Sequence, residues 1–317
     1  MNTNVTNVFI TTIISVLLLF VNGICGYAQM KGDHLLGDYG LAAGTQPVPS
    51  VVVALPIYGY NASRLVNDDG DAIDKSPDVN AFLLGLGASV VTKFKILGAN
   101  YGASLLICFT SNKIEGNTIQ SSSSFAFSDM YIQPLQLGWH FKQFDVTIGY
   151  GLYMPTGRYE PGGDNNSGMG MWTNEFSVGG TWYMDKRKSF NISTIVFYET
   201  HSDKKDTDLR VGDVITLEGG LAKTFEIPRK GTSIPMEISV GPVYYAQFKV
   251  GDDYIPLGNQ VFTGNKDLIY GLGLEGNILF PKTFTSLSFR WLGELGARNR
   301  FEGNTVLITI GQVIKVL

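Results

Sequence analysis

The sequence has 317 residues, a formal net charge of −4 and only 16% charged residues, against about 25% in a typical soluble domain. It contains no run of basic residues, which argues against the clustered basic face of a nucleic-acid-binding protein. Its 38 Gly, 15 Tyr and 19 Phe residues favour twisted strands over helices, in which each Gly costs roughly 1 kcal/mol.

The chain opens with an apolar run from Val8 to Val21, which is interrupted only by three hydroxyl residues. This run is shorter than the roughly 20 residues that a transmembrane helix needs. Gly26-Tyr27-Ala28 then places small residues at the two positions that a signal peptidase reads. We therefore predict a signal peptide over residues 1–28 and export of the remaining chain. A membrane-anchoring helix is the alternative, because no Lys or Arg precedes the run.

Residues 29–50 are too few to form a domain, yet they carry the apolar residues Leu35, Leu36, Tyr39 and Leu41 ahead of two prolines. Two interpretations follow. The segment is either a loose periplasmic N-terminal lead-in, or a small plug that folds into the periplasmic mouth of a barrel formed by the rest of the chain.

From residue 51 onward, apolar and polar residues alternate with a period of two, which is the pattern of a strand with one apolar and one polar face. Met236, Ile238 and Val240, for example, alternate with Glu237 and Ser239. No stretch of 18 consecutive apolar residues occurs beyond the signal peptide, so no transmembrane helix is expected. We predict about a dozen strands, near residues 51–60, 80–95, 100–111, 125–141, 144–155, 170–184, 188–200, 213–226, 234–249, 267–280, 283–296 and 304–317.

The connections between these strands alternate in length. The short links fall at residues 97–98, 142–143, 185–188, 228–232 and 281–282. The long polar links fall at residues 61–79, 111–124, 156–169, 201–212 and 251–266. Transmembrane barrels have short periplasmic turns and long outer loops, so parity places the N- and C-termini on the periplasmic side.

A soluble β-sandwich is the main competing fold, but its strands are typically about five or six residues long and its outer face carries more charge. Here the polar face is rich in Ser, Thr and Gly, and the predicted strands are longer. We therefore predict an all-β fold: a closed up-and-down antiparallel transmembrane β-barrel of about 12 strands over residues 51–317. It would lie in the outer membrane of a Gram-negative-type cell, in contact with lipid, after insertion by the barrel-assembly machinery.

Aromatic residues near the strand ends are typical of the girdles that barrels place at the membrane interfaces. Ordinary strand propensity is the alternative explanation. The residues concerned are Trp139, Phe141, Phe144, Tyr153, Tyr183, Phe190, Tyr198, Phe225 and Phe280.

Strand parity also predicts which charged side chains point into the lumen: Glu175, Glu218, Glu237, Glu275, Arg290 and Glu294. An Arg on the lipid face costs about 2–4 kcal/mol at mid-bilayer, so Arg290 in particular is expected inside. Either Arg290 pairs with neighbouring Glu residues and braces the wall, or these residues form a polar conduit or substrate site.

The sequence predicts no catalytic site, no metal site and no cofactor. His34, His140 and His201 are its three histidines, and they lie far apart in the predicted topology. Ser202 follows His201, but nothing supplies it with a base and an orienting acid. No ligand spacing typical of a metal site recurs.

Several short motifs resemble those of one known family. Gly37-Asp38-Tyr39-Gly40 precedes Gly44-Thr45-Gln46-Pro47, and Pro155-Thr156-Gly157-Arg158-Tyr159 is followed by Trp172. These segments resemble the outer-membrane family named for the meta-pathway of phenol degradation, also called SphA-like transporters, over roughly residues 33–317. The resemblance implies a barrel that transports aromatic or other hydrophobic compounds.

We therefore predict a channel that is not an enzyme and that lets small hydrophobic or aromatic compounds cross the outer membrane passively. The alternatives are a structural or surface-binding outer-membrane barrel without transport and, less favoured, a barrel that hydrolyses lipids.

Overall fold

The computed structural model describes residues 31–74, 77–116, 120–231, 234–257, 260–262 and 266–317. The predicted signal peptide, residues 1–28, lies outside these ranges. The described residues form strands, turns and loops and include no helix. Accordingly, no helix among them is long and apolar enough to cross a membrane.

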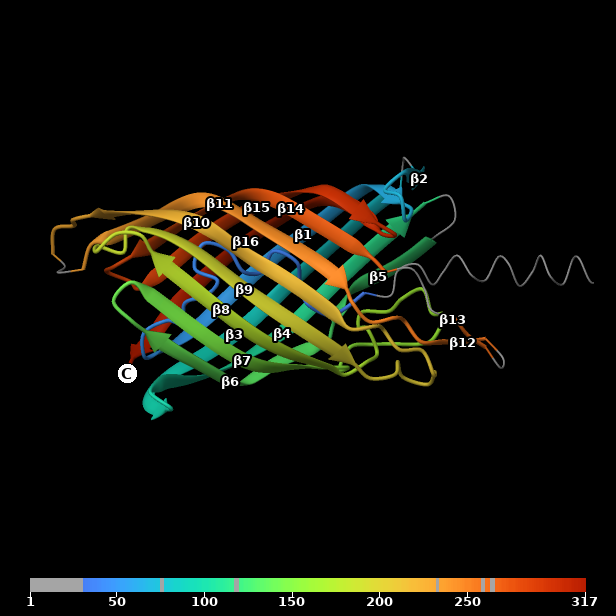
Figure 1. Ribbon diagram of the computed structural model, residues 1–317, viewed down its shortest axis with the longest axis horizontal. Helices are drawn as coiled ribbons and strands as arrows, with labels where there is room; N and C mark the ends of the chain where they lie inside the picture. The colour runs from blue at the N-terminus through green and yellow to red at the C-terminus, as the bar shows by residue number, and fades with distance from the viewer. Residues whose placement is uncertain (1–30, 75–76, 117–119, 232–233, 258–259, 263–265) are drawn as a thin grey trace, which may run out of the picture.

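Twelve long antiparallel strands form a closed barrel (Figure 1). They are β1 (Ser50–Val66), β3 (Asp78–Ile96), β4 (Ala99–Glu115), β6 (Met130–His140), β7 (Phe144–Met154), β8 (Thr173–Tyr183), β9 (Phe190–His201), β10 (Val214–Ile227), β11 (Met236–Lys249), β14 (Leu268–Phe280), β15 (Thr285–Arg298) and β16 (Phe301–Val316). The last strand pairs with the first, from Ser50 opposite Val316 to Leu65 opposite Phe301. Closure pairs every edge of the sheet, and it confirms the predicted fold.

Four short strands lie wholly or, for β5, mostly in regions that were predicted to be long links. They are β2 (Ala72–Asp74), β5 (Gln120–Phe127), β12 (Ile255–Leu257) and β13 (Gln260–Phe262). The predicted strand 125–141 is also divided, because β5 and β6 both pair with β4, one beyond the other, with Ser128 and Asp129 between them. Strands β2 and β5, which pair with β1 and β4, lengthen the wall at the end that carries the long links, whereas β12 and β13 pair only with each other. We call this end the long-loop end. The opposite end is the short-turn end.

The apolar face of the strands points outward. On β14, Tyr270, Leu272 and Leu274 are 44%, 49% and 62% exposed, whereas Ile269 before them and Glu275 after them point inward and are buried. A row of exposed apolar side chains is unfavourable in water and favourable against lipid. The period-two pattern of the sequence therefore records which face meets the membrane.

The predicted aromatic girdle is only partly correct. Phe141, Phe144 and Phe225 are exposed on the outside of the barrel. Tyr153 and Tyr183 instead point into the interior, where the Tyr183 hydroxyl donates a 2.8 Å hydrogen bond to Asp145 and Tyr153 donates one to Glu175. Their placement follows strand parity, which overrides their position near a strand end.

Residues 31–49 run through the inside of the barrel; we call them the luminal segment (Figure 1, blue). The segment joins β1 at the short-turn end, whereas Lys31 interacts with Asp267 and Arg300 at the long-loop end. Parity predicted the N-terminus on the short-turn side, but the segment turns back into the lumen. It contacts the wall so closely that a Cβ on Gly44 would lie 2.2 Å from the carbonyl carbon of Gly180.

Candidate functional site

Half of the barrel wall, from β8 to β15, carries a set of buried charged residues that we call the charged wall. Its members are Glu175 on β8, Glu199 on β9, Glu218 on β10, Glu275 on β14 and Arg290 on β15. Glu175 lies directly opposite Glu199, and Glu275 lies directly opposite Arg290, in the strand pairing. Directly paired residues point to the same face of a sheet, so these side chains project together into the lumen.

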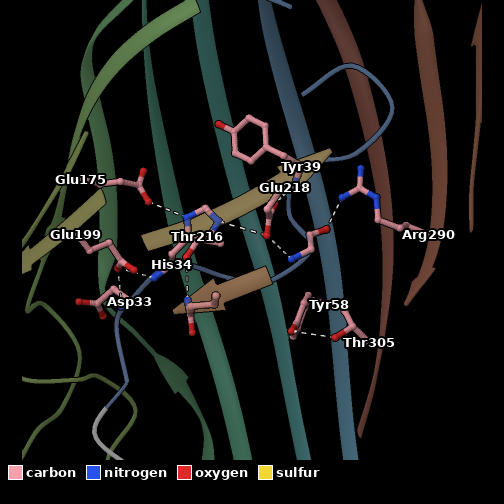
Figure 2. Close-up of polar contacts among 12 residues, drawn as sticks. Asp33, His34, Tyr39, Tyr58, Glu175, Glu199, Thr216, Glu218, Arg290 and Thr305 are labelled. Carbon is pink, nitrogen blue, oxygen red and sulfur yellow. Dashed lines mark hydrogen bonds and ion pairs between the residues drawn. The ribbon is translucent and has the colours of Figure 1, made fainter. Parts of the chain in front are cut away.

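The carboxylates of the charged wall accept hydrogen bonds from the backbone of the luminal segment (Figure 2). Five N–H groups donate to them over 2.6–3.1 Å: those of Asp33 and His34 to Glu199, those of Gly37 and Tyr39 to Glu218, and that of Leu41 to Glu275. The segment has no strand or helix partner for these N–H groups, and buried carboxylates need donors. The N–H groups of the luminal segment and the carboxylates of the charged wall therefore supply each other's hydrogen-bond partners.

His34 is the centre of this contact (Figure 2). Its Nδ1 lies 2.7 Å from Glu175 Oε2 and its Nε2 lies 3.4 Å from Glu218 Oε1. Burial alone would lower the pKa of His34, but the two carboxylates outweigh it and raise the pKa well above its usual 6.5. The imidazolium therefore bridges two strands of the charged wall.

His201 lies near the same cluster, with its Nε2 3.9 Å from Glu199 Oε1. The prediction that the three histidines lie far apart is thus wrong for His34 and His201, because it gave the luminal segment no path through the barrel. It holds for His140, which lies 3.2 Å from Asp145 at the short-turn end. Among the described residues, no group of three or more His, Cys, Asp or Glu side chains could hold a metal ion.

Arg290 serves both the wall and the segment. Its Nε and Nη2 lie 2.9 and 2.8 Å from Glu275 Oε2, and its Nη1 donates to the carbonyl oxygen of Gly37. Pairing with a carboxylate and a carbonyl compensates the cost of burying a guanidinium. The pairing with Glu275 matches the bracing interpretation of the sequence, and the bond to Gly37 adds a contact that the sequence did not indicate.

The other two predicted lumen residues lie outside the charged wall. Glu294 on β15 accepts hydrogen bonds of 2.9 and 2.7 Å from the hydroxyls of Tyr60 and Tyr245. Glu237 lies at the short-turn end of β11, opposite Glu226, and the structure does not bring it to the luminal segment.

Sequence reasoning missed Glu199 and His34 as site residues. Glu199 could have been found, because it follows the outward-facing Tyr198 and period-two alternation then turns it inward. His34 gave no comparable signal, since it lies in a segment without a regular period.

The other half of the wall, formed by β16, β1, β3, β4, β6 and β7, leaves a cavity of about 440 Å³ beside the luminal segment. We call this half the open wall. Its lining residues include Leu83, Leu106, Cys108, Tyr58, Tyr60 and Tyr131, and the cavity extends to Ser121 and Asn166 near the long loops. The lining combines apolar surface with a few hydroxyl and charged groups, which is the usual make-up of small-molecule sites.

Two aspartates of the segment face different surroundings. Burial raises the pKa of Asp33 to about 7, although the Thr173 hydroxyl donates a hydrogen bond to it. Burial and the nearby Glu218 raise the pKa of Asp38 to about 6. Asp38 lines the cavity and is exposed to it, and its carboxylate makes no hydrogen bond or salt bridge with the described residues.

A COG4313 outer membrane channel from Pseudomonas putida F1 superimposes on this chain with a TM-score of 0.72 and 12% sequence identity, over 89% of this chain and all (100%) of that chain. The β domain of the Bordetella autotransporter BrkA gives a TM-score of 0.46 at 11% identity, over 84% of this chain and 100% of that chain. No curated protein matches the sequence significantly. At 12% identity the first likeness shows the fold alone, that of an outer-membrane channel. The family described as "Putative MetA-pathway of phenol degradation" matches residues 62–310, and the chain belongs to this family.

Proposed function

We propose that this protein is an outer-membrane channel for passive movement of small hydrophobic or aromatic compounds. The observation that carries the proposal is the cavity of about 440 Å³ between the luminal segment and the open wall, which begins near the long loops and ends beside mid-barrel residues such as Leu106 and Tyr58. Its apolar wall suits a hydrocarbon or aromatic ring, and its hydroxyl groups suit a single polar substituent. The closed wall allows contact with outer-membrane lipid on every side.

We further infer that residues 29–50 act as a plug rather than as a loose lead-in. Leu36 and Leu41 pack in one cluster with Val243, Ile269 and Leu292 of the wall. Further along the segment, Gln46 is buried and its Nε2 lies 3.2 Å from Gln136 Oε1. These contacts attach the segment along the lumen, from Ile269 near the long-loop end to Gln136 toward the short-turn end, so in this proposal a solute in the cavity can continue only if the segment shifts.

Solute uptake by vesicles tests the channel function. The full-length mature chain is reconstituted into vesicles that contain lipopolysaccharide, whose polysaccharide layer slows the direct passage of small hydrophobic solutes. Uptake of 2-phenylethanol is then compared with uptake by vesicles of the same lipid without protein. A channel accelerates uptake down the gradient without an added energy source. A structural or surface-binding barrel leaves the rate at that of the lipid, and this result would refute the proposal.

The same vesicles separate a channel from a lipid hydrolase. Hydrolysis releases fatty acid from the vesicle phospholipid, and the His201→Ala variant abolishes that release if His201 is the base. A channel without hydrolase activity accelerates solute uptake and releases no fatty acid.

A further inference from the structure

The cavity has two unlike sides. The open wall presents apolar side chains, among them Leu83, Leu106 and Cys108, whereas the luminal segment presents the carboxylate of Asp38. A molecule that occupies the whole cavity therefore meets apolar surface on one side and a carboxylate on the other.

A tight turn fixes the direction of Asp38. The Asp38 N–H donates a 3.2 Å hydrogen bond to the carbonyl oxygen of Leu35, and Gly37 has φ +81°. A positive φ at the third residue is the mark of a type II turn. Gly37 faces the charged wall so closely that a Cβ there would lie 2.4 Å from Leu292 Cδ1. The turn thus holds Gly37 against the wall and leaves Asp38 exposed to the cavity.

Asp38 differs from the other carboxylates around it in having no partner. Glu175, Glu199 and Glu218 each accept hydrogen bonds from the luminal segment. The nearby cations His34 and Arg290 are already paired with carboxylates of the charged wall. Within the described residues, the cavity therefore contains a carboxylate whose charge is not compensated by direct contact, and such a group gains free energy from a cationic partner.

We propose that the cavity binds a small apolar molecule that carries an ammonium group, with the ammonium at Asp38 and the hydrocarbon or aromatic part against Leu83, Leu106 and Cys108. This inference rests on the proposed function, in which solutes enter the lumen. The cavity of about 440 Å³ lies within the roughly 300–1,000 Å³ of small-molecule sites. Lys31 and Arg300 also line the cavity, but neither forms an ion pair with Asp38, and the anionic probe below tests whether these two cations select the ligand instead.

Three probes of nearly the same shape test the proposal: 2-phenylethylammonium, neutral 2-phenylethanol and anionic phenylacetate. Their binding to the full mature chain in a neutral detergent is measured by isothermal titration calorimetry at pH 8, at which Asp38, with its pKa of about 6, is ionised. We expect the ammonium probe to bind roughly tenfold to a hundredfold more tightly than the alcohol, as for a charge-assisted hydrogen bond.

Asp38→Asn should bring the affinity for the ammonium probe down to that for the alcohol and leave the alcohol unchanged. The matched control is Asp208→Asn, since Asp208 lies exposed in the link between β9 and β10; it removes one negative charge outside the cavity and should change neither affinity. Leu106→Trp, which narrows the cavity, should weaken both probes and so locates the site.

Equal affinities for the ammonium and alcohol probes, tightest binding of phenylacetate, an unchanged Asp38→Asn variant or no binding at all would overturn the inference. The outcome is separable from that of the proposed function. Vesicles that take up 2-phenylethanol without any ammonium preference in the binding assay would refute the site and leave the channel. Binding at Asp38 without uptake would refute the channel and leave the site.

Discussion

The two halves of the barrel wall present different side chains to the lumen. The residues of the charged wall, on strands β8 to β15, bind the luminal segment: Glu175, Glu199, Glu218, Glu275 and Arg290. The open wall, β16 and β1 to β7, faces the segment across the cavity. The fold of the two halves is the same, so the difference arises from the side chains that alternate into the lumen.

The difference between the two halves shows how a barrel can bind an internal segment without strand pairing. A backbone with free N–H groups needs acceptors, and buried carboxylates need donors, so the two are stable together and costly apart. The open wall lacks such a set of carboxylates and retains free volume beside the segment. The luminal segment is therefore attached on one side of the lumen, and the cavity lies on the other side.

The largest expected effect comes from removing the segment. Deletion of residues 31–46 takes away the groups that fill the lumen beside the charged wall, so ion conductance in planar bilayers should rise severalfold. The heat-induced shift of the folded barrel in gel electrophoresis checks that the variant still folds. An unchanged conductance would show that the segment does not close the lumen, and the comparison between the two halves would lose its functional meaning.

A smaller effect is expected from removing one acceptor. Glu218→Ala leaves the N–H groups of Gly37 and Tyr39 without partners and removes one carboxylate from His34. The segment should be held less firmly by about 3–5 kcal/mol, as when a buried ion pair loses one member. Hydrogen exchange of residues 33–41 measures this loss.

The matched control for that variant is Glu237→Ala, because Glu237 was also predicted to face the lumen but lies outside the charged wall. It should leave the exchange of the segment unchanged. Equal effects of the two variants would mean that the contact does not depend on the particular carboxylates of the charged wall.

The hold on the segment should weaken as the pH rises. The pKa of His34 is raised well above 6.5, so its contribution is complete below 6.5 and is lost as pH passes through the raised pKa. The pKa values of Asp33 and Asp38, raised to about 7 and about 6 from 3.8, act in the same direction, because their protonated forms are favoured inside the barrel. Protection of residues 33–41 from exchange, corrected for intrinsic rates, should therefore be greater at pH 5 than at pH 9; the reverse order would contradict these assignments.

The smallest effect is expected for a charge pair at the strand ends near the rim. Arg64 Nη1 lies 2.7 Å from Glu302 Oε1, with the Arg64 side chain 47% exposed. Exposed pairs of this kind contribute about 0–1 kcal/mol, so Arg64→Ala should change neither the unfolding temperature of the barrel nor the exchange of the segment appreciably. A loss as large as that of Glu218→Ala would mean that burial does not set the strength of these contacts.

The barrel could be predicted from sequence because lipid imposes a strict rule on it. Every second side chain of a strand such as β14 faces hydrocarbon, and the residues Tyr270, Leu272 and Leu274 record this directly. The short strands β2, β12 and β13 and most of β5 were missed, since the long loops are not subject to that rule. Tyr153 was misplaced for a related reason: an aromatic residue near a strand end fits both an interface girdle and a lumen.

The interior was less accessible to sequence reasoning. Alternation indicates that Glu218 and Glu275 turn inward, but it does not say what they meet there. Their partners belong to a segment without a regular period, and its path is fixed by close contacts such as that of Gly44 with Gly180. Contacts between residues as distant in sequence as His34 and Glu218 become visible only once the barrel is closed.

The most direct test of the account is solute uptake by two barrels that carry the same bulky substitution on opposite halves of the wall. Leu106→Trp narrows the cavity beside the open wall, whereas Ile195→Trp adds a similar volume on β9, where Ile195 is buried against the segment near Ala43. The account predicts that Leu106→Trp lowers the uptake of 2-phenylethanol well below the wild-type rate and that folded Ile195→Trp does not. Wild-type uptake by Leu106→Trp would contradict the account, because solutes would then not pass along the open wall.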